Sequence, residues 1–79
     1  MSRPIKRSLT LRGHRTSVSL EDEFWRAFRE IAAAKSLPIN VLAAEIDVAR
    51  GTDLGLASAI RLYVLENLQA RLAEVEDDG

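Results

Sequence analysis

One short alternating stretch, "RTSVSL" at residues 15–20, sets the main constraint on the fold of this chain. Thr16, Val18 and Leu20 fall on one side of an extended strand, and the polar residues between them fall on the other. So short a strand is not stable alone, and it must pair with another strand. Because most of the remaining sequence has helical periodicity, the partner of this strand is the central question.

Three helices are predicted after the strand, over residues 21–35, 38–50 and 54–74. Three consecutive acids open the first, Pro38 takes the first position of the second, and Gly51 caps the second at its end. The predicted apolar stripes are Phe24, Phe28, Ile31 and Ala32, then Ile39, Leu42, Ala43 and Ile46, then Leu56, Ile60, Tyr63, Val64, Leu68 and Leu72. We assign the aromatic residues of these stripes to the core rather than to a ligand site.

The two ends of the chain have different compositions. Residues 1–13 are predicted to be a basic arm, in which residues 8–11, "SLTL", form either a short extra strand or extended chain. Residues 14–50 form the predicted core unit, residues 51–75 hold the third helix, and residues 76–79 are an acidic tail. The third helix packs either on its own subunit or across on another.

Charge is distributed unevenly along the chain. Residues 1–15 contain five basic residues and no acid, whereas residues 16–79 contain six basic and twelve acidic residues. A basic segment joined to an acidic body indicates a polyanionic partner for the segment alone. Lys6, Arg7, Arg12 and His14 are therefore candidate phosphate contacts, although His14 suits a turn equally well.

Composition argues against several classes of protein. The chain has no cysteine and one histidine, so we expect no disulfide, no metal site and no cofactor. No constellation of side chains around His14 and Ser17 resembles a catalytic site, so we expect no catalytic residues and no enzyme. No apolar run is long enough for a membrane span or a secretory signal, and we expect a soluble cytoplasmic protein.

Size suggests how the strand finds its partner. A domain of 79 residues has a small core and often depends on oligomerisation. Two copies could pair residues 15–20 as an antiparallel ribbon about a two-fold axis. Such a ribbon fits the major groove of DNA, where arginine binds guanine through two hydrogen bonds and serine bonds to any base edge. Arg15, Ser17 and Ser19 are therefore candidate base contacts.

The run "RTSVSLEDEFWRAFREIAAAKSLPINVLAAEI" resembles the bacterial and phage ribbon-helix-helix DNA-binding proteins. With "LASAIRLYVLENL", the chain looks similar to a longer bacterial subgroup that has a third helix. The resemblance implies a mainly α fold with one short β-strand, in an intertwined homodimer with an intersubunit ribbon. It also implies base contacts from the outward strand residues and a phosphate contact near Ile39 and Asn40. Pro38 departs from the serine or threonine that many members have there, and Asn40 suits a first-turn helix residue equally well.

The function expected is sequence-specific binding of double-stranded DNA at a pseudo-palindromic site by a homodimer that acts as a transcriptional repressor. The alternative is a protein-interaction module, in which the third helix binds a protein partner in the manner of an antitoxin. Alanine variants of the outward strand residues that stay dimeric would distinguish the two.

Overall fold

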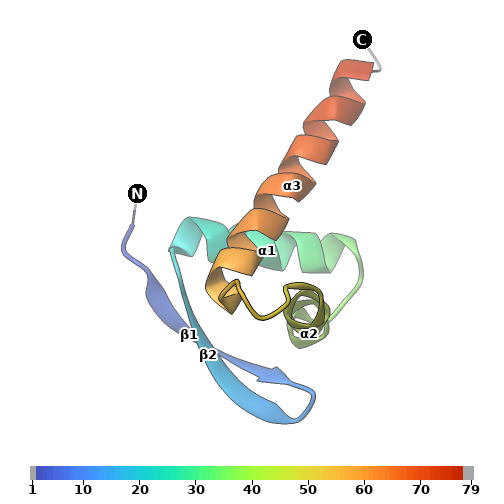
Figure 1. Cartoon of the computed structure of the whole chain (residues 1–79). Coiled ribbons are helices and arrows are strands. Elements are labelled where there is room, and N and C mark those ends of the chain that lie inside the picture. Colours follow the sequence, from blue (N-terminus) through green and yellow to red (C-terminus); the bar gives the residue numbers. More distant parts are fainter. Residues whose placement is uncertain (1, 78–79) are drawn as a thin grey trace.

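The computed structural model describes residues 2–77 as a two-stranded antiparallel ribbon followed by three helices (Figure 1). The elements are β1 (Ile5–Leu11), β2 (His14–Leu20), α1 (Asp22–Ala34), α2 (Ile39–Ala49) and α3 (Leu56–Asp77). The helices begin and end within about three residues of the predicted bounds. The fold class is therefore the one expected, a mainly helical chain with a ribbon at its start.

The partner of the alternating strand lies in the same chain. β1 pairs with β2 in a register that sets Ile5 opposite Leu20 and Leu11 opposite His14. Residues 5–11 therefore supply one partner strand within the chain, and the pairing of residues 15–20 with a second copy, at the other edge of β2, stays a prediction. The open choice over residues 8–11 is settled in favour of a strand, which begins three residues earlier than expected.

A two-residue turn closes this hairpin. Arg12 has φ 53° and Gly13 has φ 83°. Two successive positive φ values are typical of a type I′ turn, whose twist matches that of the flanking strands. Gly13 has this conformation without a steric penalty, whereas Arg12 has it at some cost. The turn fixes the register, and the register decides which side chains face the helices.

The inner face of the ribbon completes the core of the domain. Leu9, Leu11, Val18 and Leu20 are buried with side chains from all three helices. Thr16 lies on the same face of β2 as Val18 and Leu20 but is exposed. Of the three residues predicted to point inward, only Val18 and Leu20 are therefore buried. The buried helical residues are Phe28, Ile31, Ala32, Leu42, Ala43, Ile46, Ala59, Ile60 and Val64. The predicted stripes of α1 and α2 are confirmed, with Phe24 and Ile39 packed at the edge of the core, where Tyr63 of α3 also packs.

The third helix extends well beyond this core. Figure 1 shows α3 crossing the body with its first half and projecting away from the hairpin with its second half. Leu68 and Leu72, predicted to be buried, are 46 % and 59 % exposed. The helix continues to Asp77, into the predicted acidic tail, and residues 78–79 of that tail lie outside the described residues.

The end of α1 shows how local hydrogen bonds position α2. The N–H of Leu37 donates to the carbonyl of Ala32 at 2.9 Å, and that of Ser36 donates to Ala33 at 3.0 Å. This pair of bonds is a Schellman motif, which places Ser36 in the left-handed region at φ 56°. Pro38 then adopts an extended conformation as the N-cap of α2, one position before the predicted place.

Ser36→Gly is expected to raise the free energy of unfolding by about 0.5–1 kcal/mol, because glycine adopts the left-handed conformation without a Cβ penalty. Urea unfolding followed by circular dichroism measures the change. Ser58→Gly, in the first turn of α3, is the matched control and should not stabilise the protein. A lower unfolding midpoint for Ser36→Gly would contradict the assignment of strain to Ser36.

Candidate nucleic-acid interface

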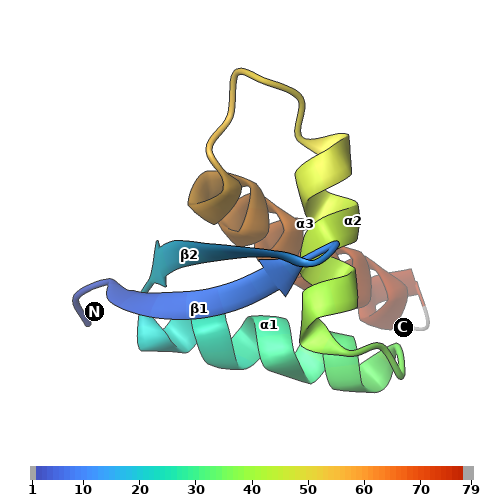
Figure 2. The same cartoon turned by 90° about the horizontal axis from the view of Figure 1, so that it is seen from below.

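The side of the ribbon that faces away from the helices is polar and open. The cross-strand pairs Lys6–Ser19, Ser8–Ser17 and Thr10–Arg15 share this side, because directly opposed residues of an antiparallel pair project to the same face. We call these six residues the outer face. All six side chains are exposed, and Figure 2, seen from below, shows the hairpin in front of the helices. The outer face has two cations, four hydroxyls and no acid.

The structure brings the three candidate base contacts together on this outer face. Arg15, Ser17 and Ser19 lie along β2, as the alternation predicts. Ser8 and Thr10 of β1 were missed, and Lys6 was expected to contact phosphate rather than to lie beside Ser19. The sequence of β1, "IKRSLTL", did contain a signal for a strand. Every second residue from Ile5 to Leu11 is apolar, with Arg7 as the one exception, and the residues between them are polar.

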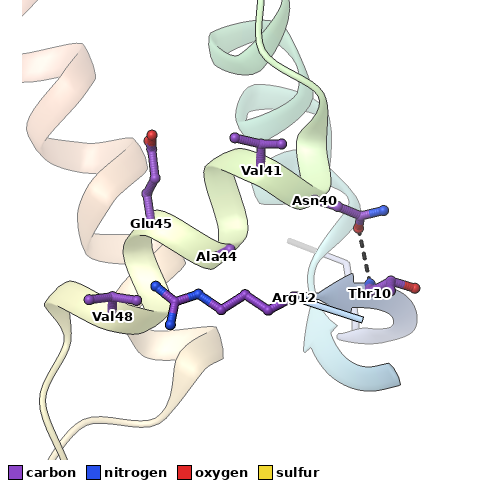
Figure 3. A pocket seen from close by; sticks show the side chains of 7 residues that line it. All are labelled: Thr10, Arg12, Asn40, Val41, Ala44, Glu45 and Val48. Carbon is purple, nitrogen blue, oxygen red and sulfur yellow. Dashed lines mark hydrogen bonds between the residues drawn. The ribbon is translucent and has the colours of Figure 1, made fainter. Parts of the chain in front are cut away.

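The N-terminus of α2 lies against the outer edge of β1. The amide oxygen of Asn40 accepts the backbone N–H of Thr10 at 3.1 Å (Figure 3). Pro38 provides no side-chain cap, and the first N–H groups of a helix have no partner within it. The backbone N–H groups of Ile39 and Asn40 therefore form the positive end of the helix dipole beside the ribbon. Such an end is a suitable place for a phosphate oxygen.

Arg12 lies on the same side as this helix end. Figure 3 shows its side chain extending from the hairpin turn alongside α2, toward Val48. Thr10, Arg12 and Asn40 line a groove of about 530 Å³, whose floor is formed by apolar residues of α2 and whose wall includes Glu45. Because Glu45 would repel an anion, the Thr10 and Asn40 end of the groove is the part suited to phosphate.

Two other candidate phosphate contacts lie elsewhere. Arg7 is on the inner side of the ribbon, where it is 3.2 Å from an oxygen of Asp22 and its guanidinium lies 5.3 Å from the centre of the Trp25 ring. These contacts join the ribbon to α1. His14 is exposed at the turn end of the ribbon, beside a cavity that Asp47 and Arg50 also line. Neither side chain is part of the outer face.

Two acids that follow β2 in the chain, Glu21 and Glu23, are held by partners. An oxygen of Glu21 is 2.8 Å from a guanidinium nitrogen of Arg61, which also donates to the carbonyl of Ser19 at 3.3 Å. The pKa of the Glu21 carboxyl is lowered by a backbone hydrogen bond and then by Arg61. The pKa of Glu23 is lowered first by the hydroxyl of Ser2. These carboxylates stay ionised and engaged with partners of their own, so they do not compete with the cations of the outer face.

Two kinds of feature are absent from the part of the chain that the structure describes. Within residues 2–75, whose side chains the structure describes, no three histidine, cysteine or acidic side chains gather in a way that could hold a metal ion. Over the same residues, no helix combines the length and the apolar character that crossing a membrane requires.

Comparison with known protein families concerns the ribbon and all three helices. The family model described as "Ribbon-helix-helix domain" matches residues 4–68, which include the ribbon, α1, α2 and the first half of α3. Neither the curated proteins nor the solved structures gave a match. Domains of this family are generally DNA-binding transcription regulators that bind as dimers. With a match over most of its length and a ribbon followed by helices, the chain belongs to the ribbon-helix-helix family.

Proposed function

We propose that this protein binds double-stranded DNA sequence-specifically as a homodimer and represses transcription, with the outer face of its ribbon in the major groove. The observation that carries the proposal is the register of the hairpin, which collects six exposed polar side chains and no acid on one face. A two-stranded ribbon fits the major groove. Arg15 is suited to guanine, and Ser8, Thr10, Ser17 and Ser19 are suited to any base edge.

Phosphate contacts would hold the ribbon in place. The N–H groups of Ile39 and Asn40 lie beside β1, tied to it through the bond between Asn40 and Thr10. We assign one phosphate to this helix end, and further phosphate contacts to Arg12 and Lys6 at opposite ends of the ribbon. His14 and Arg7 remain weaker candidates, since the first lies at the turn and the second is engaged by Asp22.

The in-chain hairpin changes how a dimer would use DNA. Each chain has a complete two-stranded ribbon, so each protomer can place its own hairpin in its own half-site. The described part of the chain measures 44 × 27 × 25 Å. Two copies of this size can set their hairpins about 34 Å apart, one turn of DNA, as dimeric readers of palindromic sites do. The proposal therefore predicts two related half-sites in adjacent major grooves.

Selection of random duplexes by the purified protein tests the proposal directly. Enrichment of a two-fold-related motif is the expected result, with affinity falling steeply as salt rises because bound phosphates release counterions. A variant with Arg15, Ser17 and Ser19 all changed to alanine should keep its helical content and lose the enriched motif. If the protein enriches nothing even at low salt, the outer face is not a DNA-binding surface.

A further inference from the structure

Arg61, on the first half of α3, joins three earlier parts of the chain. Its Nε donates to a carboxylate oxygen of Glu21 at 2.9 Å, and its Nη2 lies 2.8 Å from the same oxygen. Nη2 also donates to the backbone carbonyl of Ser19 at 3.3 Å. The guanidinium carbon lies 5.8 Å from the centre of the Phe24 ring. One side chain of α3 therefore contacts the end of β2, the residue that follows β2 and the first turn of α1.

The first half of α3 is a firm support for this side chain. Ala59 and Ile60, directly before Arg61, and Val64, one turn later, are buried in the core that the helix shares with the ribbon. Because a close-packed core fixes both the position and the rotation of the helix, it also fixes the direction from which Arg61 approaches β2.

The carbonyl that Arg61 binds belongs to the last outer-face residue of β2. Ser19 stands opposite Lys6 on the outer face, and the next residue, Leu20, is fully buried. The peptide group between Ser19 and Leu20 is thus the point at which the chain leaves the ribbon and turns toward α1. A hydrogen bond to the carbonyl of this group restrains its orientation, and with it the direction of the Ser19 side chain.

Glu21 keeps the guanidinium in this place. It is the N-cap residue of α1, yet its side chain makes no cap hydrogen bond. Its carboxylate is bound by Arg61 instead, through two nitrogens of one planar group. Such a charge-assisted pair is stronger and more restricted in geometry than a bond between neutral groups. A lysine in place of Arg61 has a single ammonium, which does not reproduce the fork of donors.

We propose that Arg61 is a positioning residue for DNA recognition, which holds the end of β2 so that Ser19 keeps the direction in which it meets a base edge. Arg61 acts through Ser19, because its own guanidinium is engaged by Glu21 and by the ribbon backbone. This inference rests on the proposed function, since Ser19 meets a base only when the outer face lies in the major groove. It concerns each protomer separately, whichever surface joins the two copies.

A double-mutant cycle on duplex binding tests the route through Ser19. Arg61→Ala is expected to weaken binding to the selected duplex about 5- to 20-fold, since one hydrogen bond is weakened in each of two half-sites. It should relax the same base position as Ser19→Ala does. In a protein that already has Ser19→Ala, it should cause little further loss. Additive losses for the two substitutions would overturn the proposal.

Arg26→Ala is the matched control for the loss of a paired positive charge. Arg26 also pairs with an acid near the start of α1, Asp22, at 2.8 Å, but its side chain is 69 % exposed. Its removal should leave the base preference unchanged and the affinity within about twofold of the wild-type value. An equal loss of affinity in Arg26→Ala and Arg61→Ala would contradict a positioning role.

Amide hydrogen exchange tests the hold on β2 without DNA. In Arg61→Ala, exchange at Leu20, the end of β2, should become at least about five times faster, and exchange at Val18, in mid-strand, should change much less. Arg61→Lys should show most of this effect. Equal acceleration at both residues would mean that Arg61 adds only general stability, and would overturn the proposal.

The two measurements separate this proposal from the proposed function. If the wild-type protein enriches no duplex while exchange at Leu20 responds as expected, DNA binding is overturned and the hold of Arg61 on β2 is supported. If a duplex is enriched and Arg61→Ala binds it like the wild-type protein, the positioning role alone is overturned.

Discussion

Arg15→Ala is expected to weaken binding to the selected duplex at least about 30-fold, since one bidentate contact of about 1–3 kcal/mol is lost in each of two half-sites. Arg15 is exposed, stands opposite Thr10 on the outer face and is not part of any ion pair among the described residues. Its removal should therefore leave the free energy of unfolding nearly unchanged. The measurement is a titration of labelled duplex, with thermal unfolding of the same samples.

Two control variants separate base recognition from attraction between charges. Arg15→Lys keeps the charge but loses the planar fork, so it should show most of the loss seen with alanine. Arg29→Ala also removes one positive charge from an exposed site, but on α1 rather than on the outer face, and it should have little effect. Arg15→Ala should in addition relax the preference at one base position per half-site. Equal losses for Arg15→Ala and Arg29→Ala would contradict a base contact.

Local signals were sufficient to predict the helices. Acids at the start of α1, proline before α2 and glycine after it act within a few residues, and each placed a helix end within one to three residues of its observed position. The outward row of β2 was equally predictable, because strict alternation permits only two faces. These features depend on neighbouring residues and not on the tertiary structure.

The strand β1 could not be predicted from local signals in the same way, for a physical reason. Arg7 interrupts its inner row, and a cation in a basic segment looks like part of a solvated arm. Its charge is accommodated only because Asp22 and the Trp25 ring lie beside it in the folded chain. Without β1, Ser8 and Thr10 had no place in the candidate interface. The turn of the hairpin needs a positive φ at both Arg12 and Gly13. Of these two residues, only the glycine indicates such a conformation in the sequence.

The apolar pattern of α3 was misread because it combines two faces. Ile60 and Val64 pack on the core, whereas Leu68 and Leu72 lie further along and further round the helix. Periodicity identifies apolar positions but not the body that covers them, so a single stripe over residues 56–72 appeared to belong to one surface. The distinction matters for stability, since side chains that stay exposed add little to the core of their own chain.

Phe28→Ala is expected to lower the free energy of unfolding by about 3–5 kcal/mol, the largest effect of any substitution considered. Phe28 is fully buried, and its ring centre lies 6.3 Å from that of Trp25, which also carries the Arg7 guanidinium over its face. Loss of the ring would leave a cavity in the core that the ribbon and the three helices share. A domain of 79 residues has a stability of only about 4–12 kcal/mol, so much of it would be lost.

Urea unfolding of the purified variants measures this effect, with Phe28→Leu as the conservative control that keeps most of the volume and should cost less than half as much. Because the outer face depends on the inner face for its support, Phe28→Ala should also weaken DNA binding at temperatures where part of the protein is unfolded. Below that range its affinity should return to the wild-type value, since Phe28 does not reach the DNA-binding surface. Wild-type stability in Phe28→Ala would contradict the core described here. A loss of affinity that persists in the fully folded variant would show that α1 shapes the outer face directly.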